Sequence, residues 1–173
     1  MSKYKTIVFD IDGTLLNTDL YICLAFLNLF QKYRKEYMPS LKELLSFSGP
    51  TLEDTFEKYF PNVDKKILFD EYERFSKENL KKYTTLYPDE ISVLDELKKR
   101  YHLAICTSRR KDAAIACLKY FDLLKYFELI ISVDDVSKPK PYPESLLKIL
   151  DFFQNDNDEV IYIGDAYTDY LCG

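Results

Sequence analysis

The chain has 173 residues, 47% hydrophobic and 31% charged, which suffices for one domain with a core and a modest insertion. Its net charge of −5 argues against nucleic-acid binding, which requires a basic patch. No apolar stretch has the length of a membrane span, and residues 1–5 run directly into the first expected strand, so we expect neither a membrane span nor a signal peptide.

Residues 6–9 are predicted to form the first strand, because the run Ile-Val-Phe is short, β-branched and aromatic, as in a strand buried on both faces. The segment 10–14, Asp-Ile-Asp-Gly-Thr, follows at once. Gly13 permits a sharp turn there. Asp10 and Asp12 are therefore expected at the carboxyl end of a strand, where open α/β sheets bind their ligands.

Two carboxylates this close repel each other unless a cation or a proton separates them. The pair therefore predicts a metal site, and a carboxylate beside a metal can act as a nucleophile. The alternative interpretation is a solvated turn, since Asp-Gly is a common turn dipeptide.

Apolar residues then recur at helical spacing, with short breaks, from residue 15 to residue 86. Ser40 with Glu43 resembles a capping box, and Thr51 with Asp54 resembles a second helix cap. The segment is predicted to be an inserted all-helical domain, with helices over about 20–37, 41–47, 52–59 and 63–83.

Strands and helices alternate in the remainder of the chain, which indicates a parallel sheet with right-handed crossovers. We therefore predict an α/β fold whose core comprises residues 1–14 and 87–173. The expected strands cover 102–106, 129–133 and 160–163, and the expected helices cover 88–100, 111–121 and 143–153.

Polar groups follow the later strands as they follow the first. Thr107 and Ser108 come after the second strand and could hold phosphate oxygens, or could cap the next helix. The proline-rich segment 138–143 comes after the third strand and presents two lysines. A fixed ammonium can neutralise phosphate or keep a nucleophilic carboxylate ionised, although most such lysines are simply solvated.

Gly164-Asp165, with Asp169, comes after the fourth strand, and these carboxylates are ligands of the kind that Mg²⁺ prefers. A solvated acidic turn is the alternative. Because the carboxyl ends of parallel strands meet at one edge of a sheet, all four sites should converge there.

Together these segments resemble the motifs of the haloacid dehalogenase superfamily of phosphohydrolases. Residues 10–15, Asp-Ile-Asp-Gly-Thr-Leu, resemble the first motif, and Thr107 fits the second. Lys140, in Lys-Pro-Tyr-Pro-Glu, fits the third, while Asp165 and Asp169 fit the fourth. The resemblance implies a Rossmann-like core, and the helical insertion resembles the α-helical cap of the superfamily's first class.

Segments 48–56 and 133–141 resemble most closely the members similar to phosphoglycolate phosphatases and to PpaX-type pyrophosphatases. Members of the family usually continue beyond the fourth motif with a further strand and helix. The resemblance therefore implies that this strand and helix are missing from the core, which would leave strand 160–163 at an exposed edge.

The resemblance also implies a mechanism. Asp10 would attack phosphorus and become an aspartyl phosphate, and Asp12 would protonate the leaving oxygen and then activate water. Mg²⁺ would be held by Asp10, by the backbone carbonyl of Asp12 and by Asp165, with Asp169 in support. Phosphate- or substrate-binding residues would be Thr107, Ser108, Lys140, Gly13 and Arg109.

Two lysines compete for the third motif, since Lys138 also begins a Lys-Pro-x-Pro sequence. Lys140 is preferred because Pro-Glu-Ser-Leu-Leu then follows in the family register, and we expect it to pair with Asp10. Arg109 adjoins the second motif and could meet an anionic substrate, although an arginine on a loop is more often simply solvated.

We expect a small phosphorylated metabolite as the substrate, no nucleic-acid or membrane partner, and a monomer or a homodimer. Cys23 and Cys106 lie in apolar runs without C-x-x-C spacing, which is typical of reduced core thiols and of the cytoplasm. Alternative functions are a β-phosphoglucomutase-like phosphotransferase, a receiver-like phosphoacceptor and a non-catalytic binding module.

Overall fold

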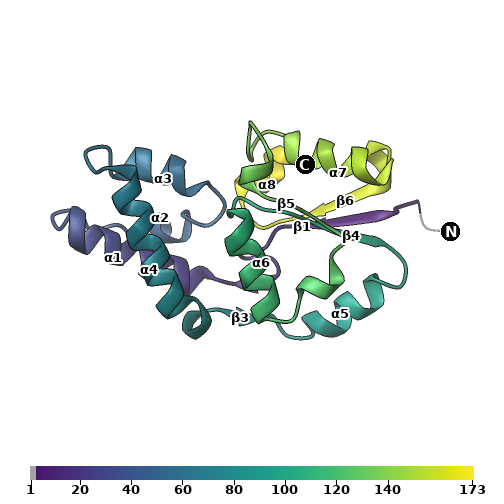
Figure 1. The fold of residues 1–173 in the computed structure, drawn as a ribbon, viewed down its shortest axis with the longest axis horizontal. Helices are drawn as coiled ribbons and strands as arrows, with labels where there is room; N and C mark the ends of the chain where they lie inside the picture. The colour runs from purple at the N-terminus through teal and green to yellow at the C-terminus, as the bar shows by residue number, and fades with distance from the viewer. Residues whose placement is uncertain (1–2) are drawn as a thin grey trace.

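The computed structural model describes residues 3–173 and centres on a four-stranded parallel sheet, ordered β5-β4-β1-β6 (Figure 1). The predicted α/β class with a parallel sheet is therefore confirmed. Residues 1 and 2 lie outside the described residues. The predicted core segment begins with them, and so does the segment in which no signal peptide is expected. The strands are β1 (Thr6–Phe9), β4 (His102–Cys106), β5 (Leu129–Ile131) and β6 (Val160–Ile163).

The register of the sheet aligns the strand ends. Phe9 at the end of β1 is level with Ile105 of β4 and with Ile163 of β6. The N–H of Asp10 donates to the carbonyl of Ile163 at 2.9 Å, and that of Thr107 to the carbonyl of Ile131 at 3.0 Å. The residues that follow each strand therefore emerge at one edge of the sheet.

Alternation along β1 buries both faces of the sheet, as the apolar run predicts. Ile7 and Phe9 belong to one apolar cluster, with residues of α5 and α6, while Val8 belongs to another, with residues of α7 and α8. The helices of the core are α5 (Glu90–Leu97), α6 (Lys111–Tyr120), α7 (Glu144–Phe153) and α8 (Tyr167–Cys172). Short 3₁₀ turns cover η1 (Leu124–Tyr126), η2 (Val133–Asp135) and η3 (Asn157–Glu159).

The inserted segment forms a separate group of helices beyond one end of the sheet (Figure 1). We refer to this segment, residues 15–86, as the cap. Its helices pack around an apolar cluster rich in Phe and Tyr. They are α1 (Asp19–Tyr33), α2 (Leu41–Leu45), α3 (Leu52–Tyr59) and α4 (Lys65–Tyr83).

A two-stranded antiparallel ribbon, β2 (Leu16–Asn17) with β3 (Thr85–Leu86), joins the cap to the core. The sequence predicts only helices here, because two residues are too few to show an alternating pattern.

Several predicted helix ends differ from the structure. Helix α1 ends at Tyr33 instead of near 37, where the N–H of Arg34 returns to the carbonyl of Phe30. Helix α5 begins only after Asp89, whose φ of 61° is left-handed and therefore not helical. Helix α8 is missing from the prediction, which assigned no helix or strand after residue 163.

The predicted cap of α2 is confirmed: the N–H of Glu43 donates to the hydroxyl of Ser40, and the N–H of Ser40 donates to the carboxylate of Glu43. The N–H of Asp54 likewise donates to the Thr51 hydroxyl at 3.1 Å. In the described part of the chain, no helix is both long enough and apolar enough to cross a bilayer. The four cysteines are buried and free.

Candidate active site

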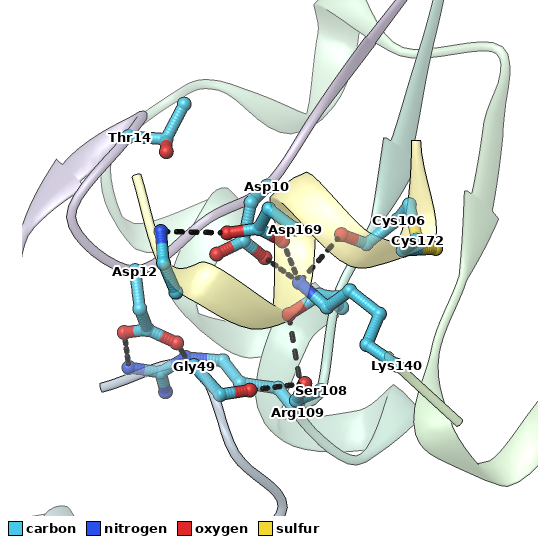
Figure 2. Close-up of polar contacts among 12 residues, drawn as sticks. Asp10, Asp12, Thr14, Gly49, Cys106, Ser108, Arg109, Lys140, Asp169 and Cys172 are labelled. Carbon is cyan, nitrogen blue, oxygen red and sulfur yellow. Dashed lines mark hydrogen bonds and ion pairs between the residues drawn. The ribbon is translucent and has the colours of Figure 1, made fainter. Parts of the chain in front are cut away.

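Asp10 lies at the end of the central strand β1 with 2% of its surface exposed. Lys140, equally buried, places its Nζ 2.9 Å from Asp10 Oδ1 and 2.6 Å from Asp169 Oδ1 (Figure 2). The same ammonium donates to the carbonyl of Cys106 at 3.4 Å. Lys138 is exposed instead, so of the two candidate lysines Lys140 is the one beside Asp10.

Burial and charge oppose each other in this cluster. Burial raises the pKa of Asp10 to about 7, although the Lys140 ammonium lowers it, and the neighbouring carboxylates of Asp169 and Asp12 add to the rise. Burial disfavours the ammonium of Lys140, but the two carboxylates outweigh this and raise its pKa. The cluster therefore contains more negative charge than one ammonium neutralises.

Asp169 is held by three donors from different segments. Its Oδ1 accepts from Lys140 and from the hydroxyl of Tyr162 at 2.6 Å, and its Oδ2 accepts from the N–H of Ala166 at 3.0 Å. Tyr162 could not be identified from the sequence, because an aromatic residue inside an apolar strand gives no sign that its hydroxyl reaches a site.

A divalent cation fits between the carboxylates. Oxygen atoms of Asp10, Asp165 and Asp169 all lie within 4.8 Å of one another. Burial also raises the pKa of Asp165, with the charge of Asp169 adding to the effect. Three clustered carboxylates with hard oxygen donors are suited to Mg²⁺. The carboxylate of Asp12 is outside this group.

The turn after β1 brings Asp165 close to the first motif. Gly13 has a φ of +75°, and a Cβ there would overlap the carboxylate of Asp165. The hydroxyl of Thr14 donates to Asp165 Oδ1 at 3.0 Å. From beside the connecting ribbon, the hydroxyl of Tyr87 donates to the carbonyl of Gly13 at 3.0 Å. Gly13 is thus needed for the close approach of the two acidic segments.

Asp12 faces away from Lys140 and is paired with Arg109. The guanidinium donates through Nε and Nη2 to the two carboxylate oxygens, both at 2.6 Å (Figure 2). Burial alone would raise the pKa of Asp12, but the charge and hydrogen bonds of Arg109 outweigh it and lower that pKa. The surroundings of the two carboxylates in the first motif therefore shift their pKa values in opposite directions, upward for Asp10 and downward for Asp12.

Thr107 and Ser108 lie between the sheet and the cap. Thr107 is buried, and its hydroxyl accepts from the N–H of Arg109 at 3.1 Å. Ser108 donates to the carbonyl of Gly49 in the cap at 2.6 Å. Helix α6 begins after Arg110, so neither hydroxyl caps it.

The loop around Gly49 touches the core a second time. Gly49 has a φ of +106°, and a Cβ there would overlap Ala166 in the loop after β6. The cap therefore contacts two of the loops that carry predicted site residues.

Comparison with known proteins gives consistent matches over nearly the whole chain. The family model for haloacid dehalogenase-like hydrolases matches residues 7–173. The pyrophosphatase PpaX of Bacillus pumilus (strain SAFR-032) is 34% identical over an alignment that covers 99% of this chain and 79% of that protein.

Solved structures share the same architecture. A candidate haloacid dehalogenase-like hydrolase from Bacteroides fragilis matches with a TM-score of 0.86 and 26% identity, over 98% of this chain and 82% of the other. A candidate β-phosphoglucomutase from Thermotoga maritima matches with a TM-score of 0.69 and 26% identity, over 97% of this chain and 79% of the other.

Proposed function

Because this chain belongs to the haloacid dehalogenase-like hydrolases, we propose that it is a Mg²⁺-dependent phosphohydrolase acting on pyrophosphate or a small phosphate monoester. The observation that carries the proposal is the buried Asp10 at the end of β1, bonded to Lys140 and clustered with Asp165 and Asp169. The similarity to a pyrophosphatase supports the choice of substrate class.

Asp10 is the proposed nucleophile. One of its oxygens would bond to phosphorus as the bond to the leaving oxygen breaks, giving an aspartyl phosphate. Lys140, whose Nζ lies 2.9 Å from Asp10 Oδ1, favours the anionic form of this carboxylate against the effect of burial and, with Thr107, would bind the phosphoryl oxygens. Asp12 would give a proton to the leaving oxygen, and would then take one from the water that cleaves the intermediate.

Asp10, Asp165 and the backbone carbonyl of Asp12 are the proposed Mg²⁺ ligands, with Asp169 in support. When bound, the cation supplies positive charge that offsets the repulsion between two anions. Asp169 also fixes the ammonium of Lys140 through the 2.6 Å bond, which leaves Lys140 aimed at Asp10. The cap would exclude water from this edge and would open to admit substrate.

The test measures phosphate release from pyrophosphate and from a panel of phosphate monoesters, with Mg²⁺ and with EDTA. We expect activity only with the cation. The variant Asp10→Asn should lose at least about 10³-fold in kcat, because the nucleophile is removed. The control is Asp158→Asn, whose carboxylate is on the surface beside Lys3 and which should keep full activity.

Unchanged turnover in Asp10→Asn would refute the nucleophile. Stable phosphorylation of Asp10 without turnover would instead support a phosphoacceptor. The likeness to a candidate β-phosphoglucomutase favours one second function, transfer to a sugar phosphate. Adding a sugar phosphate would then give a bisphosphorylated sugar in place of free phosphate.

A further inference from the structure

The pairing of Arg109 with Asp12 conflicts with the proposed work of Asp12. A carboxylate that accepts two parallel hydrogen bonds from a guanidinium is an acceptor on both oxygens. The charge and the two hydrogen bonds of the guanidinium disfavour the protonated form of Asp12, which is the form that gives a proton to a leaving oxygen. Arg109 must therefore find another partner when substrate binds.

The position of Arg109 indicates where that partner lies. Its Cζ is 5.9 Å from the ring centroid of Tyr21, which belongs to α1 of the cap. The guanidinium thus lies between Asp12 and the cap. Because the acid that protonates a leaving oxygen must touch that oxygen, the leaving group extends from Asp12 into the same space as Arg109.

Both side chains of the Arg109–Asp12 pair are partly accessible to solvent, in contrast to both side chains of the Lys140–Asp10 pair. The side chains of Arg109 and Asp12 are 14% and 13% exposed, whereas those of Lys140 and Asp10 are 2% and 3% exposed. A guanidinium in such a position can exchange one anion for another without leaving a charge buried and unpaired.

We propose that Arg109 selects substrates whose leaving group carries a second anion, by exchanging the carboxylate of Asp12 for that anion. The inference rests on the proposed phosphohydrolase function and narrows its substrate class to phosphorylated carboxylic acids and pyrophosphate. The exchange moves a cation from one anion to another, so no proton or electron is transferred in it. A substrate with a neutral leaving group leaves Asp12 paired, and it reacts slowly for that reason.

The first test compares two esters of similar length, 2-phosphoglycolate and 2-hydroxyethyl phosphate, which differ in a carboxylate. The wild type should prefer the carboxylated ester. In Arg109→Gln, kcat/KM for 2-phosphoglycolate should fall about 10- to 100-fold, as for a lost charged hydrogen bond. For 2-hydroxyethyl phosphate it should rise, because Asp12 is no longer held. Arg109→Lys, which keeps the charge without the fork, should lie between the two.

Arg110→Gln is the matched control, because this neighbouring arginine is 61% exposed and its nearest partner, Asp134, is 3.8 Å away. It should leave both esters unchanged. An equal fall for both esters in Arg109→Gln and Arg109→Lys would overturn the proposal, since it would indicate a structural role. An unchanged preference in Arg109→Gln would overturn it as well.

A binding measurement separates this inference from the proposed function. Calorimetry compares the unreactive 3-phosphonopropionate with 3-hydroxypropylphosphonate. The wild type and Arg110→Gln should bind the carboxylated probe about 10-fold or more tightly, and Arg109→Gln should bind the two equally. Equal binding by the wild type overturns the role of Arg109. The expected difference in a protein that hydrolyses neither an ester nor pyrophosphate would instead reject the phosphohydrolase and retain Arg109 as an anion-selecting residue.

Discussion

The α/β core and the helical cap bury different kinds of group. At the edge of the core sheet, Asp10, Lys140 and Asp169 are buried together as charges. The interior of the cap is mainly aromatic, and the buried charge in its described residues is Glu71. The core therefore buries charge at the candidate active site, whereas the cap is held together mainly by apolar packing. Four substitutions test this contrast, in decreasing order of expected effect.

Lys140→Met tests the charge cluster of the core. Removing the ammonium leaves Asp10 and Asp169 buried without their cation, so the free energy of unfolding should fall by about 4 kcal/mol. Urea denaturation followed by circular dichroism measures it, since the chain has no Trp. Lys138→Met removes an exposed lysine two residues away and should cost less than about 0.5 kcal/mol. Equal stability of the two variants would contradict the placement of Lys140, and not Lys138, in the buried charge cluster.

Phe56→Ala tests the aromatic interior of the cap. This ring is fully buried and contacts Phe69 with centroids 5.1 Å apart. Its loss should lower the free energy of unfolding by about 3 kcal/mol through lost burial and a cavity. Phe152→Ala, at an exposed phenylalanine of α7, is the control and should be near neutral. If Phe56→Ala matched this control, the packing of the cap would not be as described.

Glu71→Gln tests the one buried charge of the cap. The hydrogen bond from Arg74 contributes most to lowering the pKa of Glu71 to about 2, and it outweighs the opposing effect of burial. Hydrogen bonds from Lys32 and Asn28 lower this pKa further. A depressed folded pKa stabilises the protein above the unfolded value, near 4.5, and this stabilisation is lost as pH falls toward 2.

Glu71→Gln should therefore lose about 2 kcal/mol at pH 7, and the gap to wild type should narrow between pH 4.5 and pH 3. Denaturant titrations at several pH values measure the gap. The exposed Glu73→Gln on the same helix should show neither effect. If the difference in the free energy of unfolding between wild type and Glu71→Gln did not change with pH, the carboxylate of Glu71 would not be stabilised in its ionised form by Arg74 and Lys32.

Ser40→Ala tests the start of α2. The hydroxyl caps the N–H of Glu43 on an exposed turn, so its loss should cost about 1 kcal/mol. Ser40→Thr keeps an acceptor at this position and should recover most of the stability. A full loss in Ser40→Thr would show that the cap bond is not the cause.

Much of the fold could be predicted because its signals are local. The apolar run of residues 6–9 and the alternation of strands with helices after residue 87 suffice for a parallel sheet. Parallel strands bring their ends to one edge, so Asp10, Thr107 and Asp165 could be grouped without knowing any contact. The ribbon of β2 and β3 could not be predicted, because strands of two residues are too short to show an alternating apolar pattern.

The sequence alone indicates which chemical groups are present and the edge of the sheet at which they meet. The pairing of Lys140 with Asp10 was expected from the family resemblance. The pairing of Lys140 with Asp169, and that of Arg109 with Asp12 across 97 positions of the chain, could be seen only in the folded protein. The reason is physical. The apolar pattern of a helix or strand, and the residue preferences of a turn, depend on a few neighbouring residues. The partner of a buried charge depends instead on which distant segments pack against it.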